Sequence, residues 1–147
     1  MPPDLYVQLP AEPGAAGRSR RETGRWLAAL CGVDTPCNTM SDLVLAVNEA
    51  VSNSIEHAYA GAPSDVPEGT VTLRGDVEQG PVCPRLRVRF EVTDTGCWRD
   101  PSGDPGYRGR GLSMIEACAD DVDVERGPDG TTVVFHGTLG RCPGFCA

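Results

Sequence analysis

Glu49, Asn53 and His57 are the residues whose types and spacing point most directly to chemistry, because they recur every four positions in a helical pattern. At about 100° per residue, this spacing places a carboxylate, an amide and an imidazole along one stripe of a helix. Asn and His are mediocre helix formers, so a role other than helicity favours them here. A solvated helix face is the alternative reading. The stripe borders an apolar face made of Leu43, Val44, Val47, Ala50, Val51, Ser54, Ile55 and Ala58.

Asp94 and Gly96 form a second candidate site, at the end of an apolar strand. A carboxylate in this place can accept a hydrogen bond from an exocyclic amine of a ligand. A glycine two residues later lets a flat ring lie against the backbone. The structural alternative is an Asx turn that leads the chain out of the strand.

The run Gly109-Arg110-Gly111-Leu112 is a third candidate site, because two glycines precede a predicted helix over 112–119. The exposed amides at a helix start attract phosphate, and the missing side chains let it approach. Glycines that only make a turn are the alternative. The pattern matches neither the P-loop nor the dinucleotide-binding glycine motif.

The elements that position these residues follow from periodicity and turn residues. Apolar alternation predicts strands over 5–9, 71–77, 86–92, 122–125 and 131–135. Helical periodicity predicts helices over 18–30, 39–59 and 112–119. This order predicts an α/β two-layer sandwich, with a mixed, mostly antiparallel sheet and helices on one face. The residues expected to face the core include Trp26, Leu27, Leu30, Leu86, Val88, Phe90 and Val92.

The length of 147 residues fits one domain, 1–147, with a single core. The segment 97–108 contains two prolines and two glycines and has no period, which predicts a lid-like loop. The end of the chain, 140–147, is expected to be frayed. Seven scattered cysteines without Cys-x-x-Cys pairs are interpreted as free thiols rather than a zinc site; a bridge or a metal at Cys142 and Cys146 is the alternative.

The net charge of −8 argues against duplex DNA or an anionic membrane as the binding partner. A protein partner is therefore expected. No apolar run is long enough to cross a bilayer, and the N-terminus lacks a basic region followed by an apolar segment. These features predict a cytoplasmic location.

Taken together, these motifs resemble the GHKL ATPase superfamily and, within it, the RsbW-like anti-sigma factor serine/threonine kinases. The resemblance covers 5–135. The string Glu-Ala-Val-x-Asn-x-Ile-x-His-Ala-Tyr, starting at Glu49, is specific for that subfamily, and Asp-x-Gly and Gly-Arg-Gly-Leu follow in the expected order. The resemblance implies the Bergerat ATP-binding fold, with 97–108 as the ATP lid.

The resemblance also implies roles for single residues. Glu49 is expected to be the general base that acts on the substrate hydroxyl, and Asn53 to be a ligand of Mg²⁺ in Mg-ATP. Asp94 is expected to bind the adenine amine. His57 is expected to pack or form hydrogen bonds at the helix end. The other residues expected to bind ATP are Gly96, Arg108, Gly109, Arg110, Gly111, Leu112 and Thr131.

The function implied is phosphorylation of Ser or Thr in an anti-sigma factor antagonist of the STAS type, which controls whether a sigma factor is held or freed. Family members bind these partners as dimers, so a homodimer is also expected. Two features depart from the family pattern: Trp98 stands where many members have a second glycine, and the lid is short. These departures favour the alternative, a nucleotide-binding partner switch that sequesters a partner with little or no kinase activity.

Overall fold

The structure is a computed structural model of the chain. It describes residues 3–31, 38–58, 69–78, 85–94, 105–127 and 130–140. The helices are α1 (Gly14–Cys31), α2 (Asn38–Asn53) and α3 (Pro105–Cys118), and a π-helical turn, η1 (Ser54–Ala58), extends α2. The strands are β1 (Leu5–Pro10), β2 (Thr70–Val77), β3 (Arg85–Asp94), β4 (Asp121–Gly127) and β5 (Gly130–Gly140).

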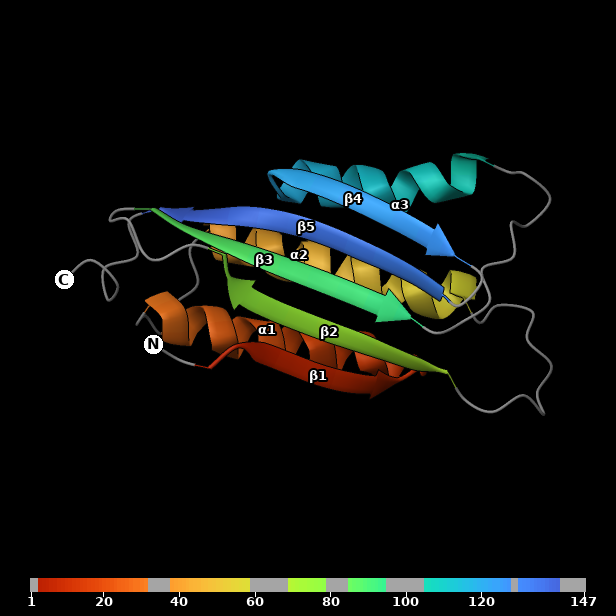
Figure 1. The fold of residues 1–147 in the computed structure, drawn as a ribbon, viewed down its shortest axis with the longest axis horizontal. Helices are drawn as coiled ribbons and strands as arrows, with labels where there is room; N and C mark the ends of the chain where they lie inside the picture. Colours follow the sequence, from red (N-terminus) through yellow and green to blue (C-terminus); the bar gives the residue numbers. More distant parts are fainter. Residues whose placement is uncertain are drawn as a thin grey trace.

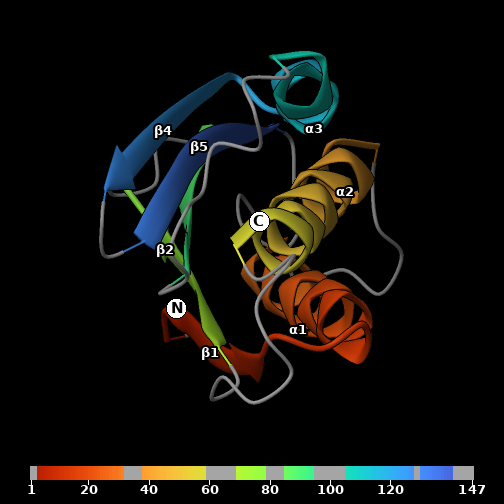
Figure 2. The ribbon, with the colours of Figure 1, turned by 90° about the vertical axis from the view of Figure 1, so that its right-hand side faces the viewer.

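The strands form one sheet in the order β1-β2-β3-β5-β4, and each neighbouring pair is antiparallel. The three helices cover one face of this sheet, with α2 between α1 and α3 (Figures 1 and 2). The α/β two-layer fold is therefore confirmed. Within the described strands the sheet is wholly antiparallel, where a mixed, mostly antiparallel sheet was predicted.

The core lies between the sheet and the helices, as alternation along the strands predicts. Leu86, Val88, Phe90 and Val92 of β3 are all buried, and so are Trp26, Leu27 and Leu30 of α1. The Trp26 ring meets Phe90 edge to face at a centroid distance of 5.7 Å, and its Nε1–H donates a hydrogen bond of 2.9 Å to the Pro3 carbonyl. An indole can therefore be buried here without leaving its polar group unpaired.

Two helices begin earlier than their periodicity predicts. α1 starts at Gly14 rather than near Arg18, and α3 starts at Pro105 rather than at Leu112. Proline is well tolerated at the first position of a helix, where its missing N–H has no intrahelical acceptor. Residues 105–108, placed in the lid by the sequence, are thus helical. Of the rest of the predicted lid, 97–104 lies outside the described residues, as does 141–147 of the predicted tail.

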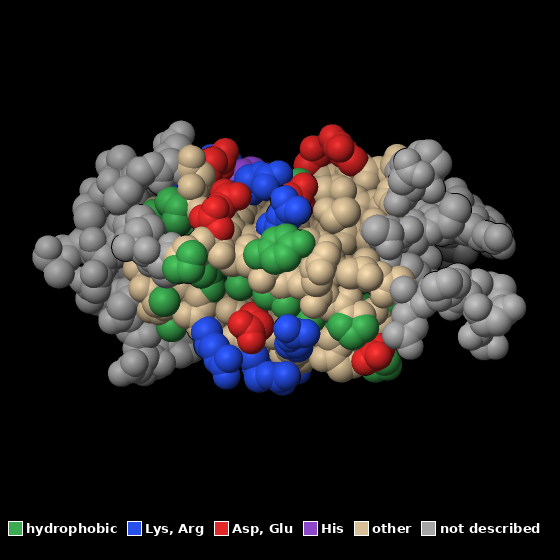
Figure 3. Space-filling view, turned by 60° about the horizontal axis from the view of Figure 1, so that its bottom comes forward, with side chains coloured by type: hydrophobic (Ala, Val, Ile, Leu, Met, Phe, Trp, Pro, Cys, Tyr) green, Lys and Arg blue, Asp and Glu red, His purple; other side chains and the backbone are tan. Residues whose placement is uncertain are grey.

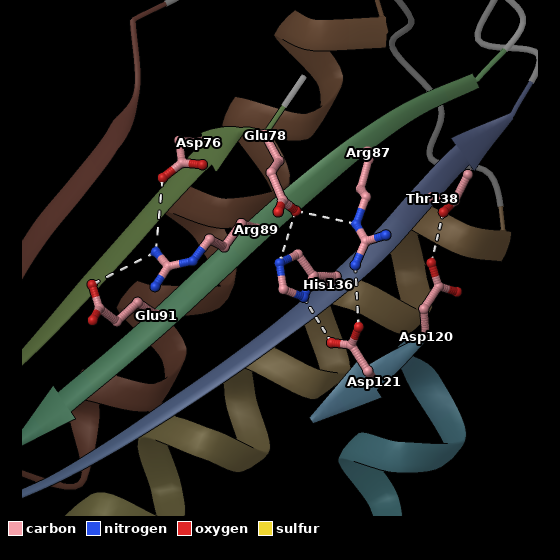
Figure 4. A network of polar contacts seen from close by, with 9 residues as sticks. All are labelled: Asp76, Glu78, Arg87, Arg89, Glu91, Asp120, Asp121, His136 and Thr138. Atoms are coloured by element: carbon pink, nitrogen blue, oxygen red, sulfur yellow. Dashed lines mark hydrogen bonds and ion pairs between the residues drawn. The ribbon is translucent and has the colours of Figure 1, made fainter. Parts of the chain in front are cut away.

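A polar network on the outer face of the sheet surrounds His136 of β5 (Figure 4). Its Nδ1 lies 2.7 Å from Asp121 Oδ1, and its Nε2 lies 2.8 Å from Glu78 Oε2. The Arg87 guanidinium bridges the same two carboxylates at 3.1 and 3.2 Å. The network links β3, β4 and β5 to the end of β2. Both ring nitrogens of His136 are engaged in these contacts. Each pair is partly exposed, so each contributes about 0–1 kcal/mol.

Candidate functional site

The candidate site lies where the C-terminal end of α2 meets the end of β3 and the start of β5. Figure 1 shows these three ends, and the start of α3, on one side of the molecule. The π-helical turn η1, which follows Asn53 directly, contacts both β3 and β5. Three motifs that are far apart in the sequence are thereby brought to one end of the sheet.

Asp94 is the buried carboxylate of this site, with 1% of its surface exposed. It pairs with Thr131 in the register of β3 and β5, and its Oδ1 accepts a hydrogen bond of 3.2 Å from the Thr131 N–H. A buried carboxylate is costly unless it is hydrogen-bonded, so this contact helps to hold it in place. The structure thus places side by side two of the residues that the sequence predicts to bind ATP.

The Thr131 side chain places a buried hydroxyl at this site. Its Oγ1 is buried and has no hydrogen-bond partner among the described residues. Such a hydroxyl costs free energy unless a water or a bound molecule satisfies it. Because it stands beside the Asp94 carboxylate, the two residues present hydrogen-bonding groups of the kind that a purine edge requires.

Glu49 and Asn53 lie one turn apart on α2, and both are partly buried. Their spacing places the two side chains on the same side of the helix, as the sequence predicts. The helix does not continue regularly after Asn53, because η1 widens the next turn to a π-helix. π-Helical turns occur frequently at functional sites. This turn also ends the regular stripe before His57, whose side chain lies outside the described part.

The glycines Gly109 and Gly111 occupy the second turn of α3 rather than its start. In a regular helix the Gly109 amide is bonded to the carbonyl four residues earlier, so it is not one of the free amides. The expectation that these glycines open the helix is therefore wrong. The side chains of Arg108 and Arg110 are outside the described set, and Leu112 is partly buried. Gly96 and Trp98 also lie outside the described residues.

Cys118 lies at the end of α3, which packs against α2. Burial raises the pKa of the Cys118 thiol, and the carboxylates of Asp42 and Glu49 raise it further. The described part contains no group of three or more His, Cys, Asp or Glu side chains that could hold a metal.

Comparison with known proteins gives a consistent result. The family model for the histidine kinase-like ATPase domain matches residues 9–136. An anti-sigma F factor from Halalkalibacterium halodurans is 29% identical over 151 residues, which cover 97% of each chain. The crystal structure of the RsbU and RsbW domains of Rv1364c from Mycobacterium tuberculosis aligns with 92% of this chain at a TM-score of 0.65 and 26% identity. This chain spans 32% of that longer one. No helix in the described part is long and apolar enough to span a membrane.

Proposed function

Because the chain belongs to the histidine kinase-like ATPase domain family, we propose that it binds Mg-ATP and transfers the γ-phosphate to a Ser or Thr of an anti-sigma factor antagonist. This transfer would control whether a sigma factor is sequestered. The similarity to an anti-sigma F factor and to an RsbW domain supports the choice of partners. Sigma factors act in the cytoplasm, so we place the protein there. We also propose that the antagonist is of the STAS type and that the protein forms a homodimer.

The buried pair of Asp94 and Thr131 is the observation that carries the proposal. The Asp94 carboxylate accepts a hydrogen bond from the adenine amine, while the Thr131 hydroxyl supports the base. Gly96 lies two residues beyond Asp94 in the sequence, and we propose that the ring lies against it because a glycine has no side chain. A carboxylate with a neighbouring hydroxyl, both buried, fits an adenine edge better than it fits a phosphate, which carries negative charge itself.

Asn53 and Glu49 are proposed to act at the triphosphate end of the nucleotide. The Asn53 amide oxygen would hold Mg²⁺, which neutralises charge on the triphosphate. Glu49, one turn earlier, orients the substrate hydroxyl and accepts its proton. We also propose that the phosphates lie near Gly109, Gly111 and Leu112 of α3, where two glycines carry no side chain, and that Arg108 and Arg110 offset negative charge on the transferred group.

Glu49→Ala is expected to abolish phosphate transfer and to leave Mg-ATP binding nearly unchanged, because the base acts on the acceptor hydroxyl and does not hold the nucleotide. Transfer is measured with radiolabelled ATP and the antagonist, and binding by calorimetry. Glu56→Ala is the matched control, since Glu56 is an exposed carboxylate in η1. If Glu49→Ala transfers phosphate at the wild-type rate, Glu49 is not the base.

A partner switch with little transfer activity is the second candidate. One observation favours it: α3 begins at Pro105, so only 95–104 separates β3 from α3. A short connection covers less of the triphosphate when it closes, and lid closure commonly completes a phosphate-transfer site. The Glu49→Ala experiment separates the two through its wild-type arm, because a switch with little transfer activity transfers little phosphate even when this carboxylate is present.

A further inference from the structure

The two edges of the sheet differ in the residues that would deter a further strand. Of the described strands, β1 and β4 stand at the two ends of the order. Charged side chains commonly protect an edge strand, and β4 carries Asp121, Asp123, Glu125 and Arg126. β1 reads Leu-Tyr-Val-Gln-Leu-Pro and has no charged residue. Of the two edges, that of β1 is therefore the more open to another strand.

The register of β1 shows which of its backbone groups point away from β2. The Ala11 N–H, one residue after β1, donates a hydrogen bond of 3.0 Å to the Gly69 carbonyl. Hydrogen-bonded and non-bonded pairs alternate in an antiparallel ladder, so Tyr6, Gln8 and Pro10 are the residues that do not bond to β2. The N–H and C=O groups of Tyr6 and Gln8 therefore point to the free edge, where no described residue bonds to them.

Arginine side chains lie along this edge on its helix side. Arg18, Arg21 and Arg25 recur at intervals of three and four residues, so they share one flank of α1, and all three are exposed. Figure 3 brings the β1 side of the molecule forward and shows basic side chains gathered along α1. Glu22 pairs with Arg25 at 3.6 Å, whereas Arg18 and Arg21 form no ion pair with another described residue.

The outer side of the edge also carries a positive charge. Arg74 of β2 stands opposite Tyr6 in the register, and its guanidinium lies 5.2 Å from the centre of the Tyr6 ring. The nearby carboxylates of Asp4 and Glu12 lie beyond the two ends of β1 in the sequence. The middle of the edge is therefore flanked by arginines on both faces, in a chain whose net charge is −8.

These charges disfavour a second copy of the chain as the added strand. α1 packs against β1, so a two-fold pairing of β1 with β1 of another copy would bring the two arginine flanks together. Like charges placed against each other are unfavourable, whereas carboxylates in the same place are complementary.

We propose that the free edge of β1 binds an extended acidic segment of a partner protein as a further antiparallel strand. The backbone of this segment exchanges hydrogen bonds with Tyr6 and Gln8. Side chains of a strand alternate between the two faces, so Asp or Glu at every second position faces α1 and reaches Arg18 and Arg21. β2 separates this edge from Asp94, and the inference does not depend on the proposed phosphate transfer.

The test measures the affinity of the full chain for a fluorescent peptide by fluorescence anisotropy. The peptide alternates Glu and Thr, and a control peptide has Lys in place of Glu. Two N-methylated forms of the Glu peptide test the pairing of its backbone. When the Glu side chains face α1, the Thr amides face β1 and the Glu amides face away from it. Methylation of the Thr amides should therefore abolish binding, and methylation of the Glu amides should preserve it.

Protein variants test the charge and the backbone of the edge separately. Arg18→Glu reverses one charge of the flank. Arg20→Glu is its matched control, because Arg20 is exposed on the same helix but lies on the side of the buried Thr23 and Leu27. Gln8→Pro removes an outward N–H, whereas Gln8→Ala keeps it. Proline is tolerated on an edge strand where the N–H faces solvent, so thermal unfolding should show that both variants fold.

We expect Arg18→Glu and Gln8→Pro each to weaken binding of the Glu peptide about fivefold or more, and Arg20→Glu and Gln8→Ala to change it less than about twofold. The Lys peptide should not bind. Equal binding of the two methylated peptides would mean charge attraction without strand pairing and would overturn the proposal, as would no binding of the Glu peptide. A dimer of the wild-type chain in sedimentation that Gln8→Pro dissociates would place a second copy on the edge and overturn it too. If Gln8→Pro fails to fold, the methylated peptides still decide whether the backbone pairs.

Discussion

Asn53→Ala is expected to remove the stabilisation that Mg-ATP gives to the wild-type protein. At about one hundred times its dissociation constant, a ligand that binds only the folded chain adds about 2.7 kcal/mol to the free energy of unfolding. In a chain of this size that corresponds to a shift of several degrees in Tm. The substitution removes the amide oxygen that would hold Mg²⁺, so the shift should fall to near zero. The measurement is thermal unfolding with and without Mg-ATP.

Asn48→Ala is the matched control for this prediction. Asn48 is a partly buried asparagine of the same helix, but its position in the helical repeat lies away from the side shared by Glu49 and Asn53. Its removal should leave the Mg-ATP shift intact. An unchanged shift in Asn53→Ala, with the fold retained, would remove Asn53 from the nucleotide site. A shift lost in both variants would point to damage to α2 rather than to a lost ligand.

Gly137→Ala is expected to destabilise the protein by about 1–3 kcal/mol, the usual cost of an overfilled core. Gly137 faces inward from β5, and a Cβ built on it overlaps the Leu43 side chain of α2. Leu43 of α2 can lie this close to β5 because residue 137 has no side chain. The same helix carries Glu49 and Asn53. Urea unfolding measures the change, and the weaker packing of α2 should also reduce Mg-ATP affinity.

Two further variants make this prediction specific. Leu43→Val shortens the side chain that would overlap the new Cβ. The double variant should therefore lose less free energy of unfolding than the sum of the two single losses. Gly24→Ala in α1 is the control, because nothing lies within 4 Å of a Cβ there. It should stabilise the protein by up to about 1 kcal/mol through helix propensity. Additive costs at positions 43 and 137 would contradict the close contact.

Much of this fold could be predicted from the sequence because its pattern is local. The alternation along 86–92 gave the strand and its buried face, and the helical period around Glu49 gave α2 and the shared side of Glu49 and Asn53. Asp94 could be recognised as a candidate ligand-binding carboxylate because it ends an apolar strand. These features depend on the period of one element at a time.

The features that the sequence did not reveal depend on geometry between elements or on context. The π-helical turn after Asn53 uses the same residue types as an α-helix, so the period of the sequence does not distinguish the two. Pro105 and the nearby glycines suggested a loop, yet proline is favoured in the first turn of α3. The network around His136 joins Glu78 to Asp121, which come together only when β2, β3, β5 and β4 pair into one sheet. The Thr131 hydroxyl, which has no hydrogen-bond partner among the described residues, also stands out only once burial is known.

The central claim is that Asp94 and Thr131 form the adenine site, and the most direct test compares Mg-ATP with Mg-ITP. The two nucleotides differ at position 6 of the purine, where ATP has an amine and ITP a carbonyl oxygen. A carbonyl facing the buried Asp94 carboxylate loses one charge-assisted hydrogen bond, worth about 1.5–3 kcal/mol. By calorimetry, the account predicts that Mg-ITP binds about tenfold to one-hundredfold more weakly than Mg-ATP. Equal binding of the two nucleotides, or binding of neither, would contradict it.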